Sequence, residues 1–321
     1  MANLLAPLVV FLTLSLLIIA LLHLLSFITN AMSRRLDPSP SPTHSNGSLS
    51  KRPSPELPPI VHSDPFKFYA GLLTSLLLLI VAASYGAISS ILLRLFGLGG
   101  LSQWTTARAF KWMMGLSTGI WFEVLNANGG KEVREDGKGD DWLNGTRPAV
   151  FLGNHQSELD ILMLGAMFPK YCSVTSKRSL MWYPFLGWFM ALSKTVFIDR
   201  ANRQSAIAAF DGAAHTMRVH RQSVFIFPEG TRSYPDHAML LPFKKGAFHL
   251  AVQAQVPIVP VAVANYANVV DVRRQIFRAG RIPVRVMEPV ETRGLGQEDV
   301  GALMERVREG MLREIEELTR L

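Results

Sequence analysis

Two long apolar runs set the amino-terminal part of the chain apart from the rest. Residues 1–33 contain no Asp, Glu, Lys or Arg, and residues 4–28 are mostly Leu, Ile, Val, Phe and Ala. This run exceeds the ~20 apolar residues that a helix needs to cross a bilayer. The basic pair Arg34-Arg35 follows the run instead of preceding it. That order favours a retained transmembrane anchor at 1–33 over a cleaved signal peptide.

A second uncharged run, 26 residues long, lies between Lys67 and Arg94. As a helix it would extend about 39 Å at ~1.5 Å per residue, more than the ~30 Å hydrocarbon core. We therefore expect a second membrane helix, tilted or bent, or a helical hairpin at 67–97. A buried hairpin in a soluble core is the alternative. The small residues Ala82, Gly86 and Ser90 form a ridge, which favours close packing on another membrane helix.

The residues between the two runs have the composition of an exposed linker. The segment 34–66 is rich in serine and contains eight prolines, so it is predicted to be disordered. Basic residues in and beside it favour a cytoplasmic location for the linker. The side of the membrane on which the remaining chain lies stays open, because it depends on whether the second run spans the bilayer.

From residue 98 onward, short β-type runs alternate with longer helical ones. The β-type runs are rich in Val, Ile and Phe and are bounded by Gly, Pro, Asn or Asp, as is typical of strands. Their alternation with helices predicts an α/β layer structure over 98–321, with both faces of the sheet covered. The charged stretch 131–141 is interpreted as a surface loop. The predicted strands are 149–152, 171–174, 195–198, 223–227, 258–263 and 283–286, and the predicted helices are 159–168, 203–221, 243–255 and 298–319.

Composition narrows the class of protein. The 321 residues are 49% hydrophobic and only 18% charged, which excludes a disordered chain overall. The single cysteine, Cys172, excludes an intrachain disulfide and a cysteine-based zinc site. The formal net charge of +8 indicates an anionic partner: nucleic acid, a membrane surface or a phosphate-bearing substrate. The sequence has no zinc-finger, RNA-recognition or helix-turn-helix pattern, so we expect no nucleic-acid partner.

Candidate chemistry begins in the segment 154–160, which follows an apolar strand and precedes a helical run. His155 and Asp160 are five positions apart in this turn. The spacing allows the carboxylate to fold back onto one imidazole nitrogen, which leaves the other nitrogen to accept a proton. The alternative is structural: Asp160 caps the helix and His155 is an ordinary turn residue.

A second segment, 225–233, is again a hydrophobic strand that runs into a turn. Gly230 lets the backbone approach a ligand closely. Thr231, Arg232 and Ser233 then supply a hydroxyl, a bidentate cation and another hydroxyl, a combination suited to a phosphate group. Taken alone, the segment could equally be a structural turn with an exposed arginine.

Together these segments resemble the motifs of the glycerolipid acyltransferase family, in particular its lysophosphatidic acid acyltransferases (1-acyl-sn-glycerol-3-phosphate acyltransferases) of fungal type. The resemblance covers roughly residues 80–290 and implies that 98–321 form a catalytic domain with a mixed sheet covered by helices. One position departs from the family pattern: Lys194 stands where the family usually has glycine. The four family motifs are matched in order by Asn154, His155 and Asp160, by 177–180 with 197–200, by 227–233, and by 256–261.

The resemblance implies a transfer reaction between two lipid substrates. His155, oriented by Asp160, would be the general base on the sn-2 hydroxyl of lysophosphatidic acid, which attacks the thioester of acyl-CoA to give phosphatidic acid and CoA. The phosphate would be bound by Arg232 with Lys177 and Arg178. Further phosphate contacts or supporting roles are implied for Gly230, Thr231, Asn154, Glu229, Ser233 and Arg200.

No cofactor and no metal ion are implied, because acyl-CoA enters as a co-substrate. The resemblance also implies a lipid bilayer as partner and the endoplasmic reticulum membrane as location. One alternative is an acyltransferase of the same fold acting on glycerol-3-phosphate or another lysophospholipid. Another is a non-catalytic lipid-binding or membrane-shaping protein. A hydrolase, with water in place of the acceptor, is a third alternative. Oligomeric state and acyl-chain preference stay open.

Overall fold

The computed structural model describes residues 64–125 and 142–321. The predicted anchor at 1–33, nearly all of the predicted linker at 34–66 and the charged stretch 131–141 lie outside these residues. The described residues begin with Asp64, whose Oδ1 accepts hydrogen bonds from the backbone N–H groups of Phe66 and Lys67. Asp64 therefore caps the first described helix, with Pro65 in its first turn.

Helix α2 (Pro65–Leu95) is continuous over 31 residues, so the second apolar run forms one helix and not a hairpin. Among the described helices it alone is long and apolar enough to cross a membrane. The ridge of Ala82, Gly86 and Ser90 is buried, and no other helix in the described ranges is a candidate membrane span. A Cβ on Gly86 would overlap the ring of Phe189 and the hydroxyl of Thr106. The ridge thus packs on helices of the α/β body.

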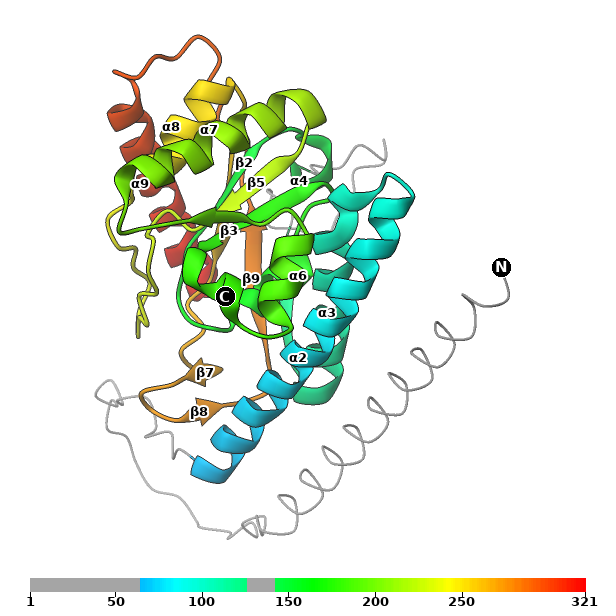
Figure 1. Cartoon of the computed structure of the whole chain (residues 1–321). Helices are drawn as coiled ribbons and strands as arrows, with labels where there is room; N and C mark the ends of the chain where they lie inside the picture. Colours follow the sequence, from blue (N-terminus) through cyan, green and yellow to red (C-terminus); the bar gives the residue numbers. More distant parts are fainter. Residues whose placement is uncertain (1–63, 126–141) are drawn as a thin grey trace, which may run out of the picture.

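The described residues form a seven-stranded mixed sheet in the order β1-β9-β6-β2-β5-β3-β4 (Figure 1). Strands β6, β2, β5, β3 and β4 are mutually parallel, whereas β9 is antiparallel to β6 and parallel to β1. The strands are β1 (Ile120–Leu125), β2 (Val150–Gly153), β3 (Cys172–Lys177), β4 (Val196–Ile198), β5 (Ser223–Ile226), β6 (Ile258–Val263) and β9 (Gly280–Val286). A separate two-stranded ladder joins β7 (Val270–Asp271) to β8 (Ile276–Phe277).

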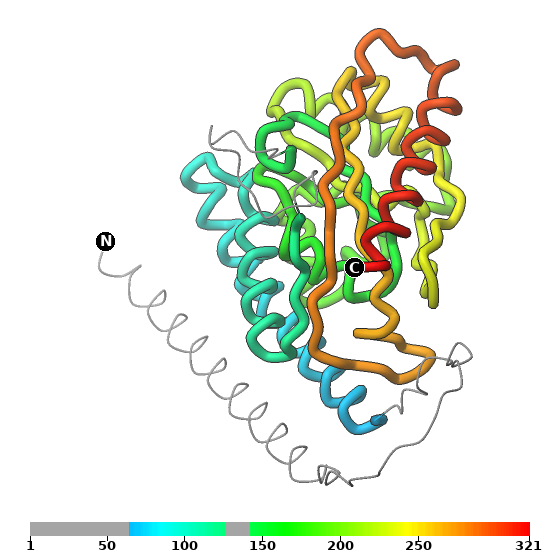
Figure 2. Tube along the Cα trace, turned by 180° about the vertical axis from the view of Figure 1, so that it is seen from behind, coloured from blue at the N-terminus to red at the C-terminus, as the bar shows by residue number. Residues whose placement is uncertain are grey.

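Helices cover both faces of the sheet, because successive strand residues point to opposite sides. Phe151 packs in the core with α3 (Ser102–Thr118) and α5 (Asp160–Met167). Val150 and Leu152 pack in the opposite core with α7 (Arg203–His220), α8 (Gly246–Ala254) and α9 (Val300–Thr319). Figure 2 shows α9 and the α2–α3 pair on opposite sides of the sheet. The predicted α/β fold with a helix-covered mixed sheet is confirmed.

The predicted elements are present with shifted ends. Strand β6 occupies its predicted range, whereas β9 begins before residue 283 and β5 ends before Phe227. Helix α8 begins at Gly246, later than predicted, because the N–H of Lys244 donates to the carbonyl of Pro228 and holds the preceding residues extended. The prediction omitted α3, β1, β7, β8 and α6 (Leu186–Leu192), as well as the short helix α4 (Trp142–Gly145) and the 3-10 turns Gly99–Leu101 and Arg178–Trp182.

The sheet topology gathers three of the four sequence motifs at one edge and places the fourth in the adjoining strand. In an α/β sheet, ligands bind beyond the carboxyl ends of parallel strands. The segment 154–160 follows β2, and 227–233 follows β5, its neighbour. The fourth motif forms β6 on the other side of β2, while Lys177 and Ile198 end the paired strands β3 and β4. Segments far apart in the chain therefore meet at this edge.

Candidate active site

His155 and Asp160 form a direct pair at the end of β2. The imidazole Nδ1 lies 2.7 Å from Asp160 Oδ2. The same oxygen accepts the backbone N–H groups of Gln156 and Ser157, at 2.7 and 3.2 Å. Because Oδ2 acts as an acceptor toward these groups, Nδ1 is the donor in this pair, and in the neutral ring Nε2 has the lone pair. In the described part of the chain Nε2 makes no hydrogen bond, and the His155 side chain is 19% exposed.

Tyr266 completes the environment of Asp160 and was not predicted from the sequence. Its hydroxyl donates to Asp160 Oδ1 at 2.7 Å and lies 2.9 Å from the hydroxyl of Ser157. Burial, reinforced by the Asp160 charge, raises the pKa of Tyr266 well above its usual value, so the phenol stays a donor. The only signal in the sequence is its position three residues past β6. Both Asp160 oxygens are thus held by hydrogen-bond donors.

Asn154 fastens the turn to the neighbouring strand. Its Nδ2 donates to the carbonyl of Val263 at 3.0 Å, and its Oδ1 accepts the Val263 N–H at 2.9 Å. Gln156 Nε2 donates to the carbonyl of Ala264 at 2.9 Å. Asn154 and Gln156 are both buried. These bonds continue the β2–β6 ladder through side chains and fix the backbone on both sides of His155.

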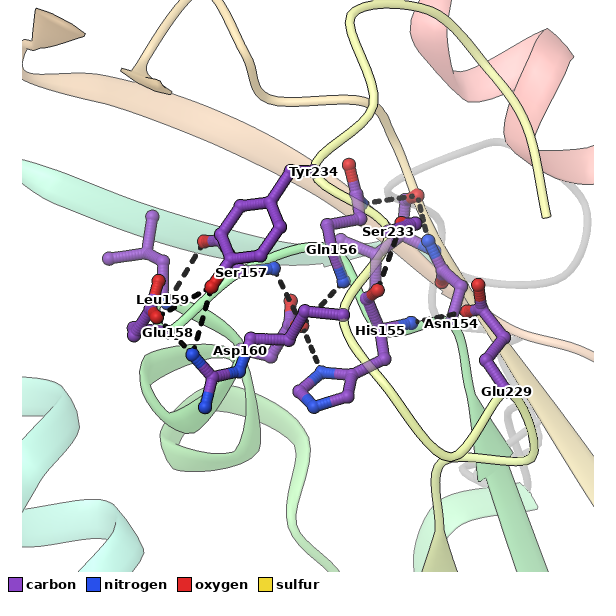
Figure 3. A network of polar contacts seen from close by, with 12 residues as sticks. Asn154, His155, Gln156, Ser157, Glu158, Leu159, Asp160, Glu229, Ser233 and Tyr234 are labelled. Atoms are coloured by element: carbon purple, nitrogen blue, oxygen red, sulfur yellow. Dashed lines mark hydrogen bonds and ion pairs between the residues drawn. The ribbon is translucent and has the colours of Figure 1, made fainter. Parts of the chain in front are cut away.

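The second segment crosses over the first and closes the site (Figure 3). The N–H and the hydroxyl of Ser233 both donate to the carbonyl of His155, at 2.9 and 3.0 Å, and the N–H of Tyr234 donates to the carbonyl of Gln156. The ring of Phe227 stacks on the imidazole with centroids 4.2 Å apart. The Ser233 hydroxyl therefore joins the two segments and does not point toward a ligand.

Glu229 is a buried carboxylate that connects three parts of the chain. Its Oε1 accepts the N–H of His155 at 2.7 Å, and its Oε2 accepts the N–H of Leu241 at 3.0 Å. Burial raises the pKa of Glu229, while these backbone hydrogen bonds oppose the shift. With both oxygens committed to backbone donors, Glu229 places the His155 backbone and is not available to a substrate.

Three cations gather around the turn at Gly230. This residue has φ +70°, and a Cβ there would come within 2.9 Å of the Lys244 side chain, so the position requires glycine. Arg200 Nη1 donates to the carbonyl of Gly230. Burial and the nearby positive charge of Arg232 lower the pKa of Arg200. Lys244 was not among the predicted site residues, although it belongs to a basic pair in the sequence.

Arg232 lies at the rim of the site and is already paired. Its Nη1 contacts Glu158 Oε1 and also donates to the hydroxyl of Tyr234 at 2.9 Å. The side chains of Arg232 and Glu158 are 42% and 53% exposed. The guanidinium is therefore within reach of solvent, but its Nη1 is occupied.

The other predicted phosphate-binding residues are less closely joined to this cluster. Lys177 ends β3 and Arg178 begins the following 3-10 turn, at the same sheet edge. In the described part of the chain, no hydrogen bond or ion pair links either residue to His155 or Arg232. Thr231 is exposed. The described ranges also contain no group of three or more His, Cys, Asp or Glu side chains placed to hold a metal ion.

Lys194, where the family usually has glycine, adopts φ +63°. This left-handed conformation is the one that glycine adopts without strain. The loop therefore has a glycine-type backbone despite the lysine. Lys194 also lines a cavity of about 490 Å³ between α7 and strands β3–β5, whose lining includes none of the residues that hydrogen-bond around His155.

Comparison with known proteins places the chain among acyltransferases. Residues 125–264 match the acyltransferase family. The 1-acyl-sn-glycerol-3-phosphate acyltransferase of Saccharomyces cerevisiae is 41% identical over 253 residues, 79% of each chain. An uncharacterized acyltransferase of Schizosaccharomyces pombe is 41% identical over 233 residues, 73% of this chain and 79% of the other. The human 1-acyl-sn-glycerol-3-phosphate acyltransferase alpha is 40% identical over 187 residues, 58% of this chain and 65% of the other.

A solved structure shares the fold. The crystal structure of PlsC, a 1-acyl-sn-glycerophosphate (LPA) acyltransferase from Thermotoga maritima, superposes with a TM-score of 0.59 at 23% identity, over 79% of this chain and 94% of that one. The motif resemblance is confirmed by the longer fungal matches. From the extent and identity of these matches, the chain belongs to the acyltransferase family that includes the 1-acyl-sn-glycerol-3-phosphate acyltransferases.

Proposed function

We propose that this protein transfers an acyl chain from acyl-CoA to the sn-2 hydroxyl of 1-acyl-sn-glycerol-3-phosphate, releasing phosphatidic acid and CoA. The observation that carries the proposal is the His155–Asp160 pair. His155 Nδ1 lies 2.7 Å from Asp160 Oδ2, and Nε2 makes no hydrogen bond within the described residues. The pair lies in the same loop cluster as Arg232, a cation suited to a phosphate monoester. Relatives named for this reaction support the choice of acceptor.

The proton moves through one imidazole nitrogen. Nε2 of His155 takes the proton of the acceptor hydroxyl as its oxygen attacks the thioester carbonyl. The ring then carries a positive charge, which the Asp160 carboxylate stabilises. When the C–S bond breaks, the imidazolium returns the proton to the CoA sulfur. A positioned base of this kind contributes typically ~10²–10⁴-fold to the rate. The acceptor supplies the nucleophile, so the reaction needs no protein serine or cysteine.

The headgroup is recognised by charge. Arg200, Arg232 and Lys244 surround the Gly230 turn, and Lys177 and Arg178 lie at the same sheet edge. A phosphate monoester with its two negative charges interacts with such a cluster more strongly than a neutral or zwitterionic headgroup. This favours lysophosphatidic acid over other lysophospholipids. Glycerol-3-phosphate carries the same phosphate and is the acceptor that an assay must exclude.

A membrane surface is the proposed place of reaction, in keeping with an expected endoplasmic reticulum location. Many side chains along the outer face of α2 are exposed and apolar, among them Leu73 and Leu76. Next to α2, the segment around α6 exposes Trp182, Tyr183 and Trp188, with Trp182 82% exposed. Tryptophan and tyrosine prefer the interfacial layer of a bilayer. Trp182 and Tyr183 come directly after β3 and its 3-10 turn, at the sheet edge that carries His155, close to where lipid substrates would enter.

The experiment is transfer of a labelled acyl group from acyl-CoA to lysophosphatidic acid by detergent-purified protein. We expect phosphatidic acid from the wild type and a loss of at least ~10²-fold in the His155→Ala variant. Glycerol-3-phosphate and lysophosphatidylcholine, tested alongside, identify the acceptor. A folded wild type that acylates none of them would contradict the proposal and leave a lipid-binding role. A fully active variant would keep the reaction but remove His155 as its base.

A further inference from the structure

Glu158 and Tyr234 hold the Arg232 guanidinium in a compact cluster. Glu158 Oε1 contacts Arg232 Nη1 and also accepts the Tyr234 hydroxyl at 2.7 Å. The Tyr234 oxygen in turn accepts a hydrogen bond from Nη1 at 2.9 Å. Figure 3 shows Tyr234 and Glu158 next to each other on the side of the network that faces away from Glu229. Neither Glu158 nor Tyr234 was predicted to be a site residue.

Glu158 differs from the other carboxylates of the site. Asp160 is buried among four donors, and Glu229 is buried between two backbone N–H groups. Glu158 is 53% exposed and its partner Arg232 is 42% exposed. An exposed ion pair is worth at most about fivefold in an equilibrium constant. The contact can therefore be exchanged for another anion at small cost.

A carboxylate and a phosphate compete for the same donors, because both bind guanidinium through charge-assisted hydrogen bonds. In the structure, Glu158 and the Tyr234 hydroxyl both bind Nη1 of Arg232, so a phosphate that binds the guanidinium through Nη1 must displace one of them. The proposed product carries the same phosphate as the proposed acceptor. Any contact with Arg232 that helps lysophosphatidic acid to bind therefore also delays the departure of phosphatidic acid.

We propose that Glu158 is an intramolecular competitor for Arg232, which leaves the guanidinium when the substrate phosphate binds and returns to it when the product leaves. This inference rests on the proposed function. Glu158 takes no part in the chemistry; it sets the affinity of the site for phosphate and promotes product release. Tyr234, bonded to both partners, guides the carboxylate back to Nη1.

The test compares Glu158→Gln with the wild type in the acyl-transfer assay. The amide has the same size and still accepts the Tyr234 hydrogen, but it lacks the charge. We expect KM for lysophosphatidic acid to fall by about two- to fivefold, and inhibition by added phosphatidic acid to strengthen by the same factor, without an increase in kcat. The matched control is Glu309→Gln, an exposed glutamate on α9, with the same change in net charge and no change in KM.

A second variant separates direct contact from the general field of a negative charge. Glu158→Asp keeps the charge but shortens the side chain, so the carboxylate no longer reaches Nη1. If the contact matters, this variant resembles Glu158→Gln; if it resembles the wild type, direct competition is refuted. An unchanged or higher KM in Glu158→Gln would also overturn the proposal, since it would mean that Glu158 does not compete or that it positions Arg232 for the substrate.

Direct binding keeps this test independent of turnover. Calorimetric titration with sn-glycerol 3-phosphate, a soluble headgroup probe, should show about two- to fivefold tighter binding to Glu158→Gln than to the wild type. Equal binding would overturn the competitor role even if lysophosphatidic acid is acylated. Tighter binding by a protein that acylates no acceptor would refute the proposed function and retain the competition.

Discussion

The Asp160→Asn substitution removes one negative charge from the site while keeping its shape. The amide oxygen can occupy the place of Oδ2 and still accept from His155 Nδ1 and from the N–H groups of Gln156 and Ser157. The amide nitrogen then faces Tyr266, whose hydroxyl can turn to donate to Ser157. Every buried polar group retains a partner, so we expect the variant to fold.

The size of the effect follows from the charge that appears on the ring. During attack the imidazole becomes an imidazolium, and the Asp160 carboxylate beside Nδ1 stabilises it. Two unit charges about 4 Å apart interact by about 4 kcal/mol at an effective dielectric constant of ~20. Loss of that interaction only in the transition state lowers kcat by about 10³-fold. KM should change little, because the lost interaction arises only when the ring becomes charged in the transition state.

The assay measures CoA release from acyl-CoA in the presence of lysophosphatidic acid, with thermal unfolding recorded on the same samples. Asp236→Asn is the matched control. Asp236 also accepts from a histidine, with His237 Nδ1 at 2.6 Å, but both side chains are mostly exposed. The same chemical change there should leave kcat unaltered. A folded Asp160→Asn variant with kcat within tenfold of the wild type would refute the charge-stabilisation reasoning.

Three further expectations can be tested separately. Tyr266→Phe deprives a buried Asp160 oxygen of its donor and should lower the free energy of unfolding by about 1.5–3 kcal/mol in urea titrations. A variant as stable as the wild type would contradict the role given to this hydroxyl. Lys194→Gly should raise the free energy of unfolding by about 1 kcal/mol, because glycine removes the strain of the left-handed backbone. Lys194→Ala should not raise it, and equal effects of the two variants would mean that the lysine side chain is the cause. Replacing exposed Trp182 and Trp188 together by alanine should lower turnover in lipid vesicles severalfold but not in detergent micelles, and equal losses in both would argue against an interfacial role.

Local pattern was sufficient for much of the fold. Strand β6 is a continuous apolar run that begins directly after Pro257, and it was predicted at its observed ends. Strand β1 was not predicted, because as an edge strand it is only partly buried and its pattern is weak. Helix α6 is short, and its exposed aromatic residues do not show the amphipathic spacing of a surface helix. Such elements are specified by what they pack against.

In the candidate site, too, local contacts could be predicted from the sequence and contacts between distant residues could not. The five-residue spacing of His155 and Asp160 was enough to predict their pairing, since both lie in one turn. Glu229 and Tyr266, which bond His155 and Asp160, lie 74 and 106 positions from those residues. The Val263 backbone, which holds the neighbouring Asn154, lies 109 positions away from it. No local spacing encodes these contacts, because they depend on β6 and β5 lying on either side of β2.

By itself, the sequence determined the alternation of strands and helices, the long apolar helix α2, the His155–Asp160 turn and the family. Only the tertiary structure decided that Arg232 is paired with Glu158 and that Lys194 takes a backbone suited to glycine. The physical reason is the range of the interactions. Apolar periodicity and turn chemistry act over a few residues, whereas strand order, and with it every contact between the loops, follows from burying both faces of one sheet.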